Sequence, residues 1–300
     1  MDILQEINKM NIGEVFKNSS LKNYNTYKID SRAEYIVYPK NVDRLIELLK
    51  FIKENGIRYK ILGKGSNVIF SDKIYDGIII KLDRFDELII DDKNITVGAG
   101  YDLMKLAIKL SRMGYTGLEF ATGIPGSVGG AVFMNAGAYN SEMANVIKEV
   151  TVLTPNLEVK KMSKDSMDFE YRSSFLKKND NYICLGVCFI LEKGNKSNII
   201  DLINDRKKRR LASQPLEYPS AGSVFRNPEG NYAGHLIEEC GLKGKKIGDA
   251  LVSEKHANFI VNNGKATGSD IRNLILCVKD SVRKKYNIEL QVEQEFVNWE

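Results

Sequence analysis

Residues 117–131 carry the sequence GLEFATGIPGSVGGA, which is poor in charge and rich in small residues. Six of the 24 glycines of the chain fall between Gly117 and Gly137. Glycine lets the backbone approach another group closely, because no side chain stands in the way. Backbone N–H groups exposed in this manner can surround an anionic ligand. The stretch therefore predicts a loop that binds phosphate groups rather than a solvent-exposed linker.

Residues 62–67, with the sequence LGKGSN, form a second glycine turn after an expected strand. Taken alone, this turn is as consistent with a tight structural turn as with a ligand site. It is not a Walker loop, because no Gly-Lys-Ser/Thr ending exists, and it lacks the third glycine of a Rossmann fingerprint at position 68. Two such turns predict a diphosphate ligand and a dinucleotide site of a non-Rossmann kind.

Apolar periodicity on either side of these turns predicts alternating strands and helices. Before residue 193 we expect strands at 34–39, 59–62, 77–82, 95–98, 150–153, 159 and 182–191, with helices at 45–52 and 103–110. The polar residues 193–197 are the most plausible domain boundary. Beyond it we expect helices at 199–211, 234–240 and 269–286, the last with Ser269 as N-cap, and strands at 250–253 and 259–262. Elements in this order favour an α+β fold.

Composition excludes several classes of protein. The chain has 300 residues, enough for about two domains, and a formal net charge of +5, too small to indicate a nucleic-acid-binding protein by itself. Only His235 and His256 are available for a histidine metal centre or a serine triad, and the four cysteines follow no zinc spacing. We therefore expect no metal. Cys184 and Cys188 are better interpreted as core residues than as a redox pair.

Charge and hydropathy along the chain argue against a membrane or nucleic-acid partner. The basic run at residues 206–210 lies at the C-terminal end of an expected helix, where cations complement the helix dipole, so a solvated helix end is the better interpretation. There is no basic leader followed by an apolar stretch, and no apolar run approaches the roughly 20 residues that span a bilayer. We expect a cytoplasmic protein with no obligate protein partner.

Further short motifs occur along nearly the whole chain. They are NTY at 25–27, LGKGSN at 62–67, MNAGAY at 134–139, YRSSF at 171–175, PSAGS at 219–223, FRNP at 225–228 and the segment 253–262. With residues 117–131, and in this order, they resemble the UDP-N-acetylenolpyruvoylglucosamine reductases, the MurB flavoenzymes of bacterial peptidoglycan synthesis. Residues 169–180 pass directly into the next expected strand, so the chain is similar to the shorter subgroup, which lacks a tyrosine-bearing insertion.

The resemblance implies the two-subdomain FAD-binding fold of the vanillyl-alcohol-oxidase (PCMH) type, followed by a C-terminal α/β substrate-binding domain. On this basis the first flavin subdomain is expected at 1–82 and the second at 83–196, joined by the C-terminal strand 288–300. The substrate domain is expected at 197–287.

The resemblance also implies an activity, that of a UDP-N-acetylmuramate dehydrogenase with non-covalent FAD. NADPH reduces the flavin, flavin N5 passes a hydride to the vinyl carbon of UDP-N-acetylenolpyruvoylglucosamine, and a proton completes UDP-N-acetylmuramate. Hydride chemistry belongs to the cofactor, so the protein supplies positioning, electrostatics and the proton. The substrate carboxylate gains charge during the reaction and needs donors aimed at it.

Three residues match the catalytic positions of this family. Arg172 suits bidentate contact with the carboxylate, Ser223 corresponds to the proton donor, and Glu293 to a second, protonated donor. The usual Leu-x-x-Glu tail of the family continues with an apolar residue, whereas Gln294 follows here. Because Glu295 would share a strand face with Glu293, it remains the alternative.

The cofactor and substrate residues are carried over from the same motifs. The two turns and the residues after them are expected near FAD: Gly63, Lys64, Gly65, Ser66, Asn67, Gly123, Ile124, Pro125, Gly126, Ser127, Gly129, Gly130, Asn135 and Ala138. Arg226 and Asn227 are expected to bind the UDP-sugar, although structural roles are as plausible for them. Three alternatives stay open: another FAD-dependent oxidase or dehydrogenase of the same superfamily, a nucleotide-binding protein without turnover, and nucleic-acid binding through residues 206–210.

Overall fold

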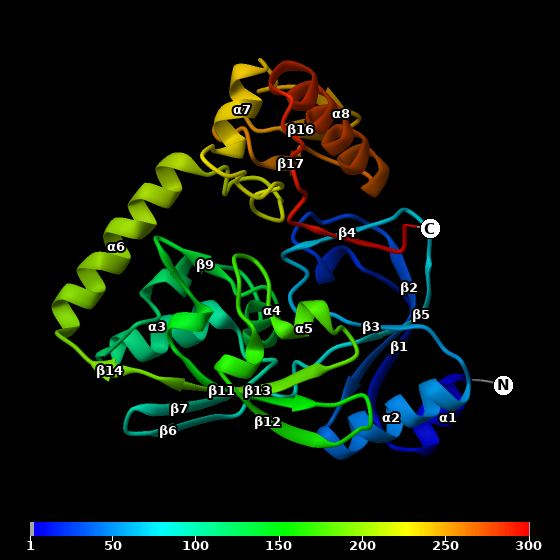
Figure 1. Cartoon of the computed structure of the whole chain (residues 1–300). Helices are drawn as coiled ribbons and strands as arrows, with labels where there is room; N and C mark the ends of the chain where they lie inside the picture. The colour runs from blue at the N-terminus through cyan, green and yellow to red at the C-terminus, as the bar shows by residue number, and fades with distance from the viewer. Residues whose placement is uncertain (1–2, 300) are drawn as a thin grey trace. The chain divides into compact units, whose positions relative to one another are not determined.

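The computed structural model describes residues 3–299, and the chain divides into two compact units. Unit 1 takes in residues up to 17, 35–64 and 77–207, and unit 2 takes in residues 18–34, 65–76 and those from 208 onwards. Each unit is therefore assembled from three separate pieces of the chain (Figure 1).

The first apolar core of unit 1 forms around α2 (Val42–Glu54). Leu45, Leu48 and Ile52 recur at helical spacing on this helix, and all three are buried. The same core takes in residues of α1 (Ile3–Lys9) and of a four-stranded sheet with the order β1-β2-β5-β3. Its strands are Gly13–Ser20, Arg32–Pro39, Tyr75–Ile80 and Tyr59–Ile61 in that order. The predicted strand-helix-strand unit is confirmed, and β3 runs parallel to β5.

The second core of unit 1 lies against an antiparallel sheet with the order β12-β11-β13-β7-β6. These strands are Val159–Ser163, Ile147–Leu153, Ile183–Ile190, Asn94–Gly98 and Leu88–Asp91. Every residue of β13 except Ile190 is buried, because β13 contributes to both cores. Cys184 and Cys188 lie on this strand as buried free thiols, which confirms their interpretation as core residues. Burial raises the pKa of Cys184 to about 12.

The glycine-rich stretch of unit 1 is ordered secondary structure rather than an open loop. Residues 119–123 form a 3₁₀ turn, and α4 (Val128–Phe133) follows and packs on β13 (Figure 1). Ser127 caps α4, its hydroxyl accepting from Gly130 N at 3.2 Å. The remaining elements of this part of the chain are α3 (Leu103–Arg112), the pair β8 (Tyr115–Thr116) and β14 (Glu192–Lys193), the pair β9 (Gly137–Ala138) and β10 (Ser141–Glu142), α5 (Phe175–Lys178) and α6 (Lys196–Ser213).

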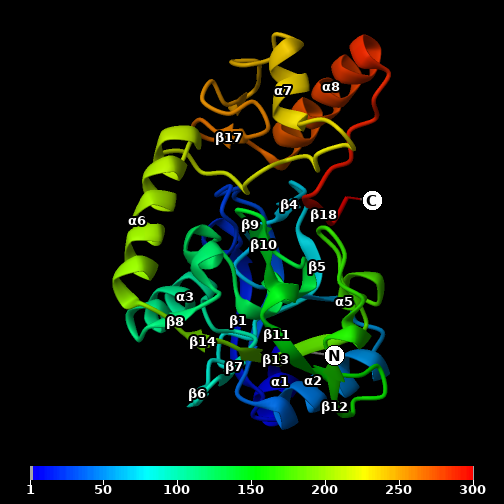
Figure 2. The same ribbon diagram turned by 60° about the vertical axis from the view of Figure 1, so that its left-hand side comes forward.

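Unit 2 is built on the long helix α8 (Gly268–Tyr286). This helix packs against α7 (Ala233–Glu239) and against an antiparallel sheet with the order β15-β16-β17 (Figure 2). The strands of that sheet are Lys246–Ile247, Ala250–Val252 and Ile260–Asn262. Tyr27, Ile29 and Ile69 belong to the same apolar core, although they lie far away in the sequence.

The last strand, β18 (Glu295–Val297), pairs in parallel with β4 (Val68–Phe70). The sequence-based division placed residues 288–300 with residues 83–196, but the hydrogen-bonded partner of β18 lies in the earlier part of the chain. The reason is the core of unit 2, in which Ile69 of β4 and residues of the C-terminal tail are buried together. A pairing of this kind leaves no local sequence signal.

The N-cap of α8 also differs from the sequence-based prediction. Thr267 rather than Ser269 is the cap, because its hydroxyl accepts from Asp270 N at 3.1 Å while the Asp270 carboxylate accepts from Thr267 N at 3.0 Å. Ser269 lies inside the first turn, where its backbone N–H donates to the Asp72 carboxylate at 3.0 Å.

The capping assignment predicts unequal effects of two alanine substitutions. Thr267→Ala should lower the free energy of unfolding by about 1 kcal/mol, because the capping box is lost. Ser269→Ala should change it by less than about 0.5 kcal/mol, since the Ser269 contact uses its backbone. Urea unfolding of the full chain, followed by circular dichroism, measures both. A larger effect of Ser269→Ala would contradict the assignment.

Candidate functional site

The two glycine turns approach each other within unit 1. A Cβ atom built on Gly63 would lie 2.6 Å from Ser127 Oγ, which is closer than real Cβ atoms come to another atom. A side chain at position 63 would displace the Ser127 hydroxyl from its cap on α4, so glycine lets the first turn pack against the start of α4 without disturbing that cap. The structure thus brings together part of both predicted phosphate-binding turns.

Two backbone amides of the second turn, those of Gly129 and Gly130, have partners inside the protein. Gly129 N donates to Ala99 O at 2.8 Å, and Gly130 N donates to Ser127 Oγ at 3.2 Å. A Cβ atom on Gly129 would lie 2.9 Å from Ala99 Cβ. In this structure these two glycines serve close packing, and their N–H groups point to protein acceptors instead of outward.

Lys81 is a buried cation beside the first turn, and sequence analysis did not single it out. Its side chain is 3% exposed, its ammonium donates to Gly63 O, and Asp83 Oδ1 lies 3.3 Å from Nζ. Burial lowers the pKa of Lys81, and the nearby Lys64 lowers it further, while Asp83 acts in the opposite direction. The available signal was a single lysine following the apolar residues 78–80. Lys64 and Lys81 together provide positive charge at the Gly63 turn.

The second half of that turn belongs to unit 2. Gly65 has φ +65°, and a Cβ atom there would lie 2.0 Å from Tyr24 O, so only glycine fits. Thr26 N donates to Gly65 O at 3.1 Å. Asn67 links the turn to the C-terminal tail, since its Nδ2 donates to Glu293 O at 3.3 Å and its O accepts from Glu295 N at 2.9 Å.

Asn135 is completely buried and connects two loops of unit 1. Its Nδ2 donates to Glu170 O at 2.9 Å, and its Oδ1 accepts from Ala144 N at 3.0 Å. The residue has φ 43°, in the left-handed region that asparagine tolerates better than most residues. The observed partners of its side chain are therefore backbone groups, which hold the MNAGAY segment to the loop that carries Arg172.

Arg172 lies in a tight turn whose ends, Glu170 and Ser173, exchange two backbone hydrogen bonds of 3.1 and 3.0 Å. Its φ of 57° is unusual for arginine and costs about 1–2 kcal/mol. The guanidinium donates from Nη2 to Gly137 O at 2.9 Å and lies over the Tyr171 ring at 5.0 Å. Strain of this kind persists where the surrounding structure over-determines it, which is common at functional sites.

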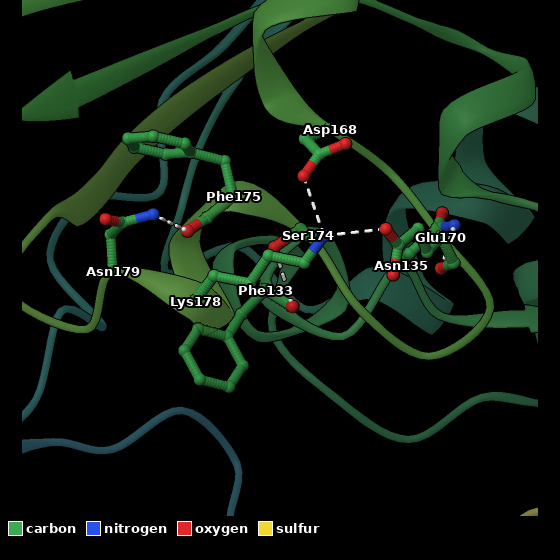
Figure 3. A network of polar contacts seen from close by, with 8 residues as sticks. All are labelled: Phe133, Asn135, Asp168, Glu170, Ser174, Phe175, Lys178 and Asn179. Atoms are coloured by element: carbon green, nitrogen blue, oxygen red, sulfur yellow. Dashed lines mark hydrogen bonds and ion pairs between the residues drawn. The ribbon is translucent and has the colours of Figure 1, made fainter.

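Figure 3 shows a polar network of residues that precede and follow Arg172 in the chain. Lys178 Nζ bonds the Asp168 carboxylate at 2.6 Å and the Glu170 carboxylate at 2.7 Å. Ser174 Oγ donates to Phe133 O, the last residue of α4, at 2.8 Å. The turn is therefore tied to the same short helix that Ser127 caps.

Ser223 and Glu293 come together in unit 2. Glu293 N donates to Val224 O at 2.8 Å, so the backbone of Glu293 lies beside the residue that follows Ser223. Both side chains are half-buried, which leaves them accessible. Asn258 holds the other side of this segment, since its O accepts from Val224 N at 2.9 Å and its side chain exchanges two hydrogen bonds with the Phe225 backbone.

The two predicted substrate residues have structural contacts as well. Arg226 N donates to Gln291 O at 2.9 Å, which continues the pairing with the C-terminal tail. Asn227 Oδ1 accepts from Ala233 N at 3.1 Å, at the start of α7. These contacts fix the backbone of Arg226 and the side chain of Asn227.

The residues at the glycine turns fit a cofactor that contains a diphosphate. The turns lack side chains where they approach each other, and two lysines supply charge of the required sign. The N–H groups of Gly129 and Gly130 do not contribute, because both are bonded within the protein. Within residues 3–299 no group of three or more His, Cys, Asp or Glu side chains is arranged to hold a metal ion. No helix in that range is long and apolar enough to cross a membrane.

Comparison with known proteins finds two domain families in the chain. A family model described as FAD binding domain matches residues 33–163. A model described as UDP-N-acetylenolpyruvoylglucosamine reductase, C-terminal domain, matches residues 214–297. The expected FAD-binding fold with an additional C-terminal domain is confirmed by these matches.

Similarity to individual proteins extends over nearly the whole chain. The UDP-N-acetylenolpyruvoylglucosamine reductase of Halalkalibacterium halodurans is 44% identical over 296 residues, 98% of each chain. That of Caldicellulosiruptor saccharolyticus is 45% identical over 293 residues, 97% of this chain and 94% of the other. The crystal structure of the Thermus caldophilus reductase has a TM-score of 0.80 at 33% identity, covering 94% of this chain and 98% of the other.

The position of Lys81 predicts a specific effect on cofactor affinity. Lys81→Met should weaken FAD binding by about tenfold or more, because a buried cation and the donor to Gly63 O are both lost. Titration of the apoprotein with FAD, followed by flavin fluorescence, gives the affinity. Lys161→Met removes the same charge from a side chain that is 70% exposed and should leave the affinity unchanged. Equal losses of FAD affinity in both variants would contradict this prediction, because they would show that affinity depends only on the net charge of the protein.

Proposed function

The chain belongs to the UDP-N-acetylenolpyruvoylglucosamine reductase family, and we propose that it reduces UDP-N-acetylenolpyruvoylglucosamine to UDP-N-acetylmuramate with NADPH as reductant. It is a flavin-dependent oxidoreductase, and FAD is its cofactor. The observation that carries the proposal is the placement of Ser223 beside the Glu293 backbone, in a family member whose Arg172 has a strained backbone. A cytoplasmic location is part of the proposal, because both nucleotide substrates would be met there.

The chemistry that FAD supplies when bound is the carriage of a hydride between reductant and substrate. The residues that would hold it are those of the two glycine turns, with Lys64 and Lys81 near the diphosphate, and Asn135 and Ala138 in the segment after α4. In this proposal residues 1–82 and 83–196 form the flavin-binding part, and residues 197–287 bind the UDP-sugar with the help of Arg226 and Asn227.

Arg172 is proposed to bind the substrate carboxylate. A guanidinium has a permanent charge and a planar set of donors, so it stabilises a carboxylate whose negative charge grows during the reaction. The tight turn presents this side chain from a fixed backbone, and the network around Lys178 holds the turn in place. A donor preorganised in this manner contributes about 3–4 kcal/mol to transition-state stabilisation.

Ser223 is proposed to donate the proton that completes the reduction, and Glu293 to hydrogen-bond the substrate carboxylate in its protonated form. A hydroxyl is a weak acid, but the carbanion-like species formed by hydride addition is a strong base. Glu293 is favoured over Glu295 because its backbone is bonded to Val224, next to Ser223, whereas the Glu295 backbone is bonded to Asn67.

Purification and a redox assay test the proposed function. The protein should carry, or take up, a yellow flavin that is released on denaturation. It should oxidise NADPH in a manner that depends on the enolpyruvyl UDP-sugar. A colourless protein that takes up no FAD, or a flavoprotein that does not turn over this substrate, would refute the proposal.

Ser223→Ala should separate the two halves of the reaction. Anaerobic NADPH should still bleach the flavin at the normal rate, while reoxidation by the enolpyruvyl UDP-sugar should slow by about 10²–10⁴-fold, because the proton donor is missing. Stopped-flow absorbance measures both steps. Ser220→Ala removes a hydroxyl from the same segment and serves as the control. Slow bleaching with normal reoxidation would contradict the role of Ser223.

Two further substitutions test which glutamate takes part. Glu293→Ala should lower kcat at least 10²-fold, whereas Glu295→Ala should stay within a few-fold of the wild type, since preorganised donors at the reacting group dominate the barrier. Steady-state turnover of both variants measures this. The reverse result would assign the role to Glu295.

A further inference from the structure

Gln294 is a buried polar side chain that lies between the two glutamates of the C-terminal tail. It is 3% exposed, whereas Glu293 and Glu295 on either side are half-buried, as expected from period-two alternation. A buried carboxamide destabilises the fold unless its hydrogen-bonding groups are satisfied, so its partners indicate what it does.

The amide nitrogen of Gln294 points at three successive carbonyl groups. Nε2 lies 3.1 Å from Ala221 O, 3.4 Å from Gly222 O and 3.4 Å from Ser223 O. Nε2 has two hydrogens for three acceptors. The hydrogen bond to Ala221 O is the shortest, and the carbonyls of Gly222 and Ser223 share the second hydrogen. These three carbonyls belong to the turn that leads into Ser223, where Gly222 has φ +76°.

The hydroxyl of Tyr27 fixes which end of the carboxamide faces that turn. Tyr27 Oη donates to Gln294 Oε1 at 3.0 Å. Tyr27 is completely buried, and burial raises its pKa well above the ordinary value, so the phenol stays protonated and acts as a donor. With Oε1 held by this donor, Nε2 must face the carbonyls.

Tyr27 is itself anchored to the core of unit 2. Asn262 Nδ2 donates to Tyr27 O at 2.9 Å, and Asn262 Oδ1 accepts from the backbone N–H groups of Gly264 and Ala266. A continuous series of buried hydrogen bonds therefore runs from Asn262 through Tyr27 and Gln294 to the Ser223 turn.

We infer that Gln294 is a positioning residue, which holds the backbone of the Ser223 turn so that the Ser223 hydroxyl has one fixed place, and that Tyr27 orients Gln294 for this task. The inference rests on the proposed function of Ser223 as proton donor. Proton transfer depends steeply on donor distance and angle, so a small movement of this turn slows that step more than it weakens substrate binding. Gln294 acts through Ser223 and does not itself touch the substrate.

The test is a double-mutant cycle on the oxidative half-reaction of the holoenzyme. Gln294→Leu keeps the volume and removes the hydrogen bonds, and Tyr27→Phe removes only the hydroxyl. We expect reoxidation of the reduced flavin by the enolpyruvyl UDP-sugar to slow about 10- to 100-fold in Gln294→Leu and several-fold in Tyr27→Phe. Flavin reduction by NADPH and the KM for the UDP-sugar should stay within about twofold of the wild type.

The cycle is completed in the Ser223→Ala background. There Gln294→Leu should not slow flavin reoxidation further, because the hydroxyl that Gln294 positions is absent. The solvent deuterium isotope effect on reoxidation should rise in Gln294→Leu and Tyr27→Phe, since proton transfer becomes slower. Gln291→Leu, an exposed change on the same tail, is the matched control.

Three results would overturn the inference. The first is that Gln294→Leu slows reoxidation as much in the Ser223→Ala background as in the wild type. The others are that flavin reduction slows as much as reoxidation, or that reoxidation is normal in both Gln294→Leu and Tyr27→Phe. If Gln294→Leu does not fold, Tyr27→Phe gives the same comparison. Absence of wild-type turnover would instead refute the proposed function, and with it the role of Gln294. Wild-type turnover with additive losses would refute the inference alone.

Discussion

The close approach of Gly63 to Ser127 is the constraint on which unit 1 depends. A side chain at position 63 would occupy the space of the Ser127 hydroxyl, and that hydroxyl caps α4. Phe133 at the end of α4 in turn accepts a hydrogen bond from Ser174, two residues after Arg172. One missing side chain therefore allows the glycine turns, the short helix and the arginine turn to form one connected structure.

The elements that sequence patterns predicted well are those whose burial repeats within one segment. Helices α2, α3 and α8 bury residues at helical spacing, and strands β2, β5 and β13 are mostly buried apolar runs, so the positions of both follow from local patterns. The cap of α8 was misplaced by two residues, because Ser269 and Thr267 are chemically alike and only the reciprocal bonds of Asp270 distinguish them. The pairing of β18 with β4 depends on a shared core and has no local pattern.

For the candidate site, motifs identified residues but not the contacts that orient them. Arg172, Ser223 and Glu293 were selected by resemblance, and nothing in the sequence indicates that Arg172 has a left-handed backbone. Sequence patterns do not identify Lys81, Asn258 and Gln294 as supporting residues, because the partner of a buried polar side chain cannot be read from its neighbours in the sequence. In the structure each of them satisfies backbone carbonyl or N–H groups of a loop. The Asn258 and Gln294 carboxamides and the Lys81 ammonium thus hold loops in place by hydrogen bonds, whereas the cores are held by apolar packing.

The parallel pairing of β4 with β18 also has a consequence for how the protein is made. The partner of β4 lies far later in the chain, so it is synthesised on the order of ten to fifty seconds after β4 at ordinary rates of translation. During that interval Ile69 and the segment around Tyr27 lack the core that buries them in the finished protein. Unit 2 can therefore close only after β18 has been made, although other residues of the same unit are synthesised much earlier.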